Sequence, residues 1–396
     1  MNVCQRSVLI GILLSLGACA NAPPPSPTPI KPVATQSVIA DVEPVNPGPL
    51  SMDTTAHQYA QQRARQRITI AAVGDIMLGT DYPNNRLADD DGASLLAAVT
   101  PWLAHTDITF GNVEGVLSDT AKPEKRCSNP SACYLFRSPE RYARHLANAG
   151  FDVVSFANNH ARDFGEQGRS DSMAAATALG IHHSGRVGDI ASWTVKELKI
   201  AMIAFAVTRG SWSMLEIAPA AMQVSKLASE HDIVIVSFHG GAEGVSALRI
   251  PFANETYYNE PRGDVVAFSR TMVDVGADLV LGHGPHVVRG MERYRDRIIA
   301  YSLGNFATYY GISVAGEKGV APVLQVTLNG FGEFESGRIE SARQRRPDGP
   351  LPDPTRRALR AIAALSVADF GAPGLIFESD GGLREAPRRR PTPHQP

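Results

Sequence analysis

The chain has few cysteines, few aromatic residues and almost no net charge. Four of its 396 residues are cysteine, aromatic residues make up 7%, and the formal net charge at pH 7 is −2. The near-zero charge argues against a nucleic-acid partner. No internal repeat is visible, and the apolar stretch Val8–Leu16 is too short to span a bilayer as a mature helix.

The amino terminus has the composition of an export signal. Arg6 supplies a positive charge before the apolar stretch, and Leu16-Gly17-Ala18-Cys19 follows it. That tetrapeptide resembles a bacterial lipobox, which implies cleavage before Cys19 and a lipid anchor on that cysteine. Ala20 after the cysteine favours the outer membrane, so we expect a lipid-anchored envelope protein that faces the periplasm. The alternative is a plain signal peptide cut near Ala20 or Ala22.

Composition also indicates how the rest of the chain is divided into a tether, a main domain, an extension and a tail. Residues 19–66 begin with a segment rich in Pro, Ala, Thr and Ser, which predicts an extended tether that ends in a short polar helix over 53–67. We place the main domain at 67–345, followed by a helical or irregular extension at 346–386. Residues 387–396 contain an arginine run and prolines, which predicts a disordered tail. The signal peptide occupies 1–18.

Two cysteines remain in the expected domain. Cys127 and Cys133 flank a turn-rich loop. In an oxidising periplasm a disulfide between them would contribute about 2 to 3 kcal/mol. The alternative is a two-cysteine zinc site, for which only His145 lies near in sequence.

Six short apolar runs each end in polar residues of the kind found at active sites. The runs are Ile68–Val73, Asp107–Phe110, Val153–Phe156, Ile233–Phe238, Leu279–Leu281 and Ile298–Tyr301. Such runs, stopped by Gly, Asn or Pro, predict buried strands. In α/β sheets the ligand crevice lies outside the carboxyl ends of the strands, so we expect all six clusters to share one rim.

Helical patterns alternate with these strands. They cover 92–104, 139–149, 166–179, 219–230 and 262–275, with Pro139 at a first helical position and Gly150, Gly180 and Gly276 just past helix ends. The alternation predicts a layered α/β fold.

The residues at the strand ends form a candidate metal-ligand set. A single Asp at a strand end is usually a turn or capping residue, but histidine is a poor cap, so the recurrence of imidazoles indicates metal binding. The expected ligands are Asp75, Glu114, Asn159, His239, His283 and His286. Carboxylate, amide and imidazole without thiolate suit Mn²⁺, Zn²⁺ or an iron ion, and six ligands suffice for one or two ions.

The same residues suggest a hydrolytic reaction. A metal-activated water could attack a phosphoryl or carbonyl centre while an acid protonates the leaving group. We assign that acid to His160, with Asp163 orienting its ring.

Five motifs of the chain resemble the CapA family of capsule and poly-γ-glutamate biosynthesis proteins, which looks like a branch of the calcineurin-like metallophosphoesterases. The motifs, all within about 68–329, are Gly74-Asp75-Ile76-Met77, Asn112-Val113-Glu114-Gly115, Ala157-Asn158-Asn159-His160-Ala161-Arg162-Asp163, Gly282-His283-Gly284-Pro285-His286 and Tyr301-Ser302-Leu303-Gly304-Asn305-Phe306. The resemblance implies a four-layer αββα sandwich of two mixed sheets and the metal ligands named above. We expect five further residues to form a substrate rim: Asn112, Asn158, Glu243, Ser302 and Asn305.

The chain departs from the family pattern at two points. Met77 stands where ordinary metallophosphoesterases have a histidine, as is usual in the CapA branch. His239-Gly240-Gly241-Ala242-Glu243-Gly244 stands where the CapA pattern commonly reads His-Trp-Gly-x-Glu-Tyr, so two aromatic surfaces are absent.

Two functions follow from the resemblance and the site. One is a metal-dependent hydrolase that acts on an exported anionic polymer, with the polymer's synthase or export complex as a partner. The other is a non-catalytic lipoprotein that binds or anchors the polymer and keeps a structural or vestigial metal site. An ordinary 5′-nucleotidase-like scavenger would need an aromatic pocket for the base, which the sequence does not reveal.

Overall fold

The computed structural model describes residues 52–126 and 133–387. The expected signal peptide, the lipidated Cys19 and most of the tether lie outside these residues. So do Cys127 and nearly all of the expected tail, and the disulfide therefore stays a prediction. The short helix expected at the end of the tether is present as α1 (Met52–Arg65).

The first sheet has ten strands and contains the first and the last strand of the described chain. Its main order is β20-β21-β18-β17-β1-β2-β5-β6, while β16 pairs with β1 and β19 with β18. The strands are β1 (Arg67–Met77), β2 (Ile108–Val113), β5 (Val153–Ser155), β6 (His182–Ser184), β16 (Asn305–Thr308), β17 (Val320–Asn329), β18 (Phe334–Arg345), β19 (Gly349–Pro352), β20 (Leu375–Phe377) and β21 (Gly382–Glu385). Strands β1, β2, β5 and β6 are parallel, whereas β17 runs antiparallel to β1.

The second sheet has seven strands from the middle of the chain. Its main order is β14-β15-β13-β10-β8-β7, and β9 pairs with β8. The strands are β7 (Ala191–Val195), β8 (Leu198–Ala206), β9 (Trp212–Ser213), β10 (Ile233–His239), β13 (Leu279–His283), β14 (Met291–Tyr294) and β15 (Arg297–Ala300). Two small ribbons, β3 (Val116–Leu117) with β4 (Arg137–Ser138) and β11 (Glu255–Tyr257) with β12 (Glu260–Gly263), lie outside both sheets.

All six predicted strands are confirmed, three in each sheet. Their apolar runs are continuous because both faces of each strand are buried. On β1, Ile68 and Ile70 pack into the core between the two sheets, whereas Ala71 and Val73 pack into a second core on the opposite face.

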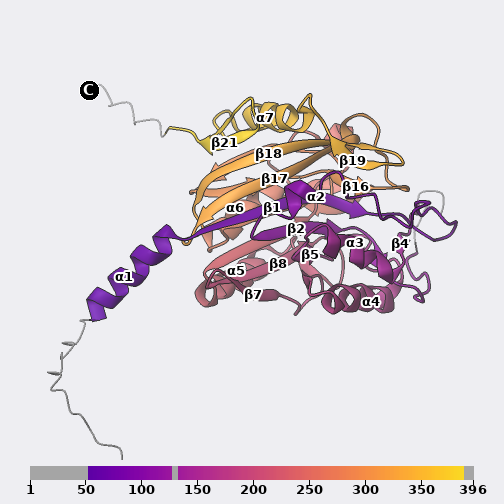
Figure 1. The fold of residues 1–396 in the computed structure, drawn as a ribbon, viewed down its shortest axis with the longest axis horizontal. Helices are drawn as coiled ribbons and strands as arrows, with labels where there is room; N and C mark the ends of the chain where they lie inside the picture. Colours follow the sequence, from indigo (N-terminus) through magenta and orange to yellow (C-terminus); the bar gives the residue numbers. More distant parts are fainter. Residues whose placement is uncertain (1–51, 127–132, 388–396) are drawn as a thin grey trace, which may run out of the picture. The chain divides into compact units, whose positions relative to one another are not determined.

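Helices cover the outer faces of both sheets and complete four layers (Figure 1). On the first sheet lie α2 (Thr100–Leu103), α3 (Ala143–Asn148), which continues the 3-10 helix 140–142, and α4 (Gly165–Ala178). On the second lie α5 (Ile217–Glu230) and α6 (Val265–Asp274). Side chains of α7 (Arg357–Phe370), such as Ile362, enter the core between the sheets. The αββα sandwich expected from the sequence is therefore confirmed.

Two predicted helices differ from the structure. In the segment 92–104 only α2 is helical, and the residues before it form successive turns. Pro101 has no amide proton to donate, and the Asp90 carboxylate accepts from the backbone of Gly92 and Ser94, which favours tight turns. The segment 262–275 becomes helical only after Asp264, whose carboxylate caps α6 by accepting from Val266 and Ala267.

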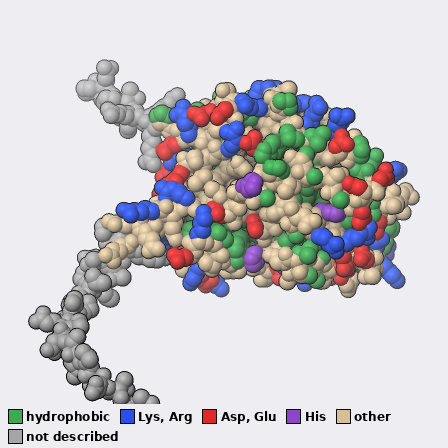
Figure 2. Space-filling model, viewed as in Figure 1, with side chains coloured by type: hydrophobic (Ala, Val, Ile, Leu, Met, Phe, Trp, Pro, Cys, Tyr) green, Lys and Arg blue, Asp and Glu red, His purple; other side chains and the backbone are tan. Residues whose placement is uncertain are grey.

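The surface of the domain mixes charges of both signs. On the face shown in Figure 2, Lys and Arg side chains alternate with Asp and Glu side chains. Among residues 52–126 and 133–387 we find no helix long and apolar enough to cross a bilayer.

Candidate metal centre

The carboxyl ends of strands from both sheets meet at one site. Asp75 on β1 pairs in register with Asn112 on β2 and with Asn305 on β16. In the other sheet, His239 at the end of β10 pairs in register with His283 at the end of β13. The shared rim expected from the sequence thus draws on both layers.

Close approach of two backbones explains the glycine before Asp75. The Asp75 amide donates to the Gly304 carbonyl at 2.8 Å. A Cβ atom on Gly74 would lie 2.0 Å from that same oxygen, a distance that no side chain can tolerate. The Gly-Asp pair therefore allows β1 to pass against the segment leading into β16, and it directs the carboxylate into the site.

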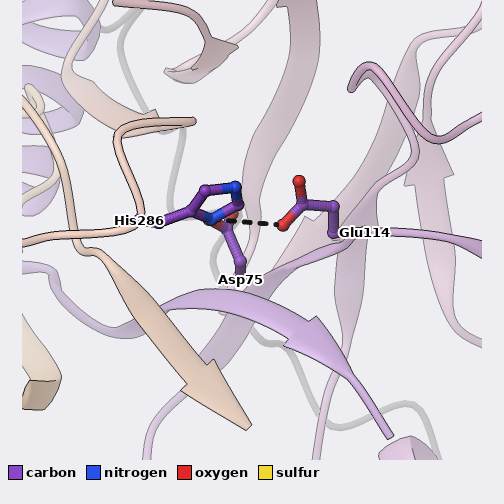
Figure 3. Close-up of side chains that lie close together, drawn as sticks. All are labelled: Asp75, Glu114 and His286. Atoms are coloured by element: carbon purple, nitrogen blue, oxygen red, sulfur yellow. Dashed lines mark ion pairs between the residues drawn. The ribbon is translucent and has the colours of Figure 1, made fainter. Parts of the chain in front are cut away.

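Asp75, Glu114 and His286 form the centre of the site (Figure 3). One candidate ligand atom from each lies within 4.8 Å of the others. His286 Nδ1 lies 3.3 Å from Asp75 Oδ2 and 3.7 Å from Glu114 Oε2. Both carboxylates are fully buried. Two carboxylates and an imidazole at this spacing are a suitable donor set for a divalent cation.

His286 is held in an unusual backbone conformation. Its φ is 57°, in the left-handed region that costs a side-chain-bearing residue roughly 1 to 3 kcal/mol. Its Nδ1 lies 2.9 Å from Asn305 Oδ1, and the Asn305 amide group donates to the carbonyls of Ser313 and Lys318. Those two bonds orient the Asn305 oxygen toward His286. The strain is therefore maintained by contacts that aim the imidazole at the carboxylates.

The ring of His283 has a defined tautomer. Its Nε2 lies 3.1 Å from the Val73 carbonyl, which can only accept, so Nε2 carries the proton. Nδ1 is then an unprotonated acceptor, and it is buried without a hydrogen-bond partner among the described residues. A histidine that donates one ring nitrogen to a carbonyl and leaves the other free is the usual arrangement of a metal ligand.

The other predicted ligands also carry unpartnered atoms. His239 Nε2 lies 3.9 Å from Glu114 Oε1, beyond hydrogen-bond range, and Asn159 Oδ1 is buried. Around the two carboxylates, the buried candidate ligand atoms without a hydrogen-bond partner among the described residues are Asp75 Oδ2, both Glu114 carboxylate oxygens, His239 Nε2 and His283 Nδ1. Asn159 Oδ1 is also buried and unpartnered, on the segment that follows β5. Unsatisfied buried polar atoms are rare in proteins. Their concentration here fits a site built for a cation.

The charges of the cluster are strongly coupled. Burial raises the pKa of the Glu114 carboxyl well above its ordinary value, and the neighbouring charge of Asp75 raises it further. Although burial alone would lower it, the two carboxylates raise the pKa of His286 to about 10. Burial also opposes ionisation of Asp75, but His286 and the other imidazoles bring its pKa down to about 2. A positive charge between the carboxylates is therefore strongly favoured.

His160 and Asp163 lie together, as the sequence suggested. Asp163 Oδ2 lies 2.7 Å from His160 Nδ1 and also accepts from the Phe136 amide at 2.8 Å. The Phe136 ring packs against the imidazole with centroids 4.3 Å apart. Lys125 Nζ lies 2.8 Å from Asp163 Oδ1. Because the carboxylate accepts from Nδ1, the other ring nitrogen of His160 is left for proton exchange.

Four of the five expected rim residues are buried. Asn112 donates to Asp75 Oδ1 at 2.8 Å, and Asn158 donates to the Val113 carbonyl and to Asn112. Ser302 donates to the Val287 carbonyl. With Asn305, these side chains orient the ligands and loops around the centre. Their polar groups are bonded within the protein, and contact with substrate stays a prediction for all four.

The fifth rim residue, Glu243, belongs to a network of buried arginines that could not be expected from the sequence. Glu243 Oε1 lies 2.9 Å from Arg262 Nη2, and its Oε2 lies 3.8 Å from His286 Nε2. Arg289 binds Glu255 through two bonds of 2.7 and 2.6 Å. Glu255 in turn accepts from the Ala242 amide. The two arginines, both essentially unexposed, fix the loop that follows His239.

Comparison with known proteins identifies a family match over most of the domain. The sequence model of the family described as "Bacterial capsule synthesis protein PGA_cap" matches residues 69–310. That range includes each predicted metal ligand together with His160 and Asp163.

Two curated proteins are similar to this chain. It is 29% identical over 277 residues to the capsule biosynthesis protein CapA of Bacillus anthracis, covering 64% of this chain and 62% of that one. It is 27% identical over 291 residues to the PGA biosynthesis protein CapA of Bacillus subtilis strain 168, covering 69% and 71%. The chain thus spans less than two thirds of the first of these relatives.

Among solved structures, a 5′-nucleotidase precursor from Thermus thermophilus is similar to 76% of this chain and 59% of its own, with a TM-score of 0.37 and 12% identity. A likeness of this degree says nothing about the substrate.

Proposed function

This chain belongs to the PGA_cap family of bacterial capsule synthesis proteins, and we propose that it is an exported, metal-dependent hydrolase. Its substrate would be a phosphoester or amide linkage in an envelope polymer. The resemblance of its motifs to the CapA family is confirmed by the family match and by the two curated relatives. Those relatives are named for capsule and PGA biosynthesis, and we assign this chain to the same kind of process.

The observation that carries this proposal is the combination of two features at one site. Buried, unpartnered oxygen and nitrogen atoms converge where the two sheets meet. Beside them, Asp163 holds one nitrogen of His160 and leaves the other available. A purely structural metal site has no need of an oriented proton-transfer group, so the pair favours catalysis.

The roles of the residues follow from their contacts. Asp75, Glu114, Asn159, His239, His283 and His286 would hold one or two divalent ions, for which Mn²⁺, Zn²⁺ and iron suit the donor set. A bound divalent ion supplies Lewis-acid polarisation of the substrate and makes water a nucleophile at neutral pH. In its doubly protonated form, His160 would donate the Nε2 proton to the leaving group, while Asp163 and Phe136 keep its ring in place.

The location and partners of the protein are part of the proposal. The lipobox-like sequence supports a lipid anchor on Cys19 at the periplasmic face of the outer membrane. An exported anionic polymer, with its synthase or export complex, would be the partner. Labelling with a radioactive fatty acid tests the anchor, because the label should enter the wild-type chain and be lost in Cys19→Ala.

One observation favours the second candidate, a polymer-binding protein that does not turn its ligand over. Met77 occupies the first-motif position at which ordinary metallophosphoesterases have a histidine. It packs in a small apolar cluster with Phe136 and Ile312, so this position offers no ligand. A site with one ligand fewer holds its second ion less tightly, which suits a binding role better than hydrolysis.

Metal analysis and a hydrolysis screen distinguish the two candidates. The purified chain would be analysed for bound metals after dialysis, then assayed with bis(p-nitrophenyl) phosphate and with γ-linked glutamate oligomers. We expect His160→Ala to keep its metal and to lose roughly 10²- to 10⁴-fold in turnover, the usual contribution of a positioned acid. Asp75→Ala should lose both metal and turnover.

Each of three outcomes would decide a different part of the proposal. A wild type that binds metal but hydrolyses neither substrate, while binding polymer, assigns the protein to the non-catalytic class. Turnover that survives His160→Ala places the proton donor elsewhere. Equal metal content in wild type and Asp75→Ala would refute the assignment of the centre itself.

A further inference from the structure

A cavity of about 270 Å³ adjoins the segment that carries Asn159 and His160. Three loops form its walls: 124–125 after β3, 158–162 after β5, and 208–211 after β8. β5 and β8 belong to different sheets, and in each sheet they run parallel to strands that carry the metal centre. Crevices outside such strand ends are where α/β proteins bind ligands.

The cavity is lined by three cationic side chains, of which two already have anionic partners. Lys125 lies 2.8 Å from the buried carboxylate of Asp163. Arg162 lies 3.0 Å from Glu166. The third, Arg209, is exposed, and in the described part of the chain no hydrogen bond or ion pair involves its guanidinium. Arg209 is therefore the cation that remains available to a ligand.

The loop that carries Arg209 is firmly tied to the site. Thr208 Oγ1 donates to the Asn158 carbonyl at 3.1 Å. The Gly210 carbonyl accepts from the buried Arg169 at 3.0 Å and from the Val187 amide at 3.2 Å. Residues on both sides of Arg209 are thus anchored, one of them to the residue next to the proposed ligand Asn159. A fixed backbone reduces the entropy lost when the guanidinium binds.

We propose that this cavity is a substrate subsite that receives a carboxylate of the polymer unit next to the reacting bond, with Arg209 as its binding residue. The planar fork of a guanidinium matches a carboxylate through two hydrogen bonds. Glu124 also lines the cavity and would repel a more highly charged group. One free cation and one carboxylate on the wall suit a singly charged, carboxylate-bearing unit. This inference rests on the proposed function for the nature of the polymer, and it does not require turnover.

The test is an equilibrium binding measurement with a fluorescein-labelled pentamer of γ-linked glutamate in the presence of Mn²⁺. Arg209→Ala should raise the dissociation constant by roughly tenfold or more, the effect of losing a charge-assisted hydrogen bond. Arg209→Lys keeps the charge but loses the planar guanidinium, so its dissociation constant should lie between those of the wild type and Arg209→Ala. Arg345→Ala is the matched control, because Arg345 is also exposed and does not line the cavity. Metal content should be the same in all four proteins.

The possible results bear separately on the subsite, on the carboxylate assignment and on the hydrolase. Equal binding by wild type and Arg209→Ala overturns the proposal, as does a wild type that does not bind the pentamer. If a glycerol-phosphate oligomer binds more tightly and with the same dependence on Arg209, the carboxylate assignment is wrong. Binding that depends on Arg209 in a protein without turnover refutes the hydrolase and leaves the subsite standing. Turnover with binding and KM unchanged in Arg209→Ala refutes the subsite alone.

Discussion

Replacing Glu114 by glutamine should remove most of the stability that bound metal adds to the domain, without lowering the stability of the metal-free domain. Metal at 100 times its dissociation constant adds about 2.7 kcal/mol to the free energy of unfolding. The roughly 330 described residues have an unfolding entropy of about 0.7 kcal/mol/K, so the wild-type midpoint should rise by about 4 °C. If the lost carboxylate weakens binding about 100-fold, the same metal adds only about 0.4 kcal/mol, a rise below about 1 °C.

Without metal, the Glu114→Gln variant should be at least as stable as the wild type. Both Glu114 oxygens are buried and have no hydrogen-bond partner among the described residues, and Asp75 lies in the same cluster. A neutral amide of the same shape removes a carboxylate from this unfavourable position. We therefore expect Glu114→Gln in chelator to unfold at the wild-type midpoint or above it.

The assay is thermal unfolding followed by circular dichroism, in chelator and in a series of Mn²⁺ and Zn²⁺ concentrations. Glu216→Gln is the control, because Glu216 is exposed at the start of α5 and its side chain caps no amide. The control should keep the full metal-dependent rise. If Glu114→Gln also keeps the full metal-dependent rise, the Glu114 carboxylate is not a ligand. If Glu114→Gln in chelator unfolds several degrees below the wild type, the buried carboxylate does not destabilise the metal-free domain.

Three further outcomes are expected. Asp163→Asn should lower turnover less than removal of the imidazole it orients, because the proton donor stays; an equal loss in steady-state assays would make Asp163 more than a positioning residue. Arg289→Met should cost about 3 to 5 kcal/mol in denaturant unfolding, because it leaves Glu255 buried and unpaired, and adding Glu255→Gln should recover much of it; a single variant as stable as wild type would refute this. The unreduced tryptic peptide 127–137 should be lighter than its reduced form by two hydrogen atoms, and equal masses would exclude a Cys127–Cys133 disulfide.

The strands and the ends of the strands could be predicted because each is a local signal. A continuous apolar run such as Ile233–Phe238 predicts a strand with both faces buried, and the residue after it must then lie at an edge. This rule places His239 and His283 at an edge, and the structure puts them opposite each other in register. The segment 92–104 misled the prediction because its apolar spacing is helical while Pro101 and Asp90 favour turns.

The residues that orient the site could not be predicted, because their roles depend on contacts distant in sequence. Arg262 and Arg289 are indistinguishable in the sequence from surface arginines, yet both are buried behind the loop that carries Glu243. Lys125 pairs with a carboxylate 38 positions further along the chain. Asn112 is predicted at the substrate rim, and only the structure shows that its amide donates to Asp75. No periodicity marks such partners, since each is defined by where two loops meet.

The proposed metal ligands are divided between two sheets, and this division determines whether folding or metal binding comes first. Asp75 and Glu114 belong to one sheet and its loops, while His239, His283 and His286 come with the other. Neither half offers more than a partial set before the sheets pack together. At the proposed site, metal capture would therefore follow tertiary folding, and a chain delivered unfolded across a membrane would arrive without an ion. The ions available in the compartment of folding, rather than those at the ribosome, would then determine which metal occupies the proposed site.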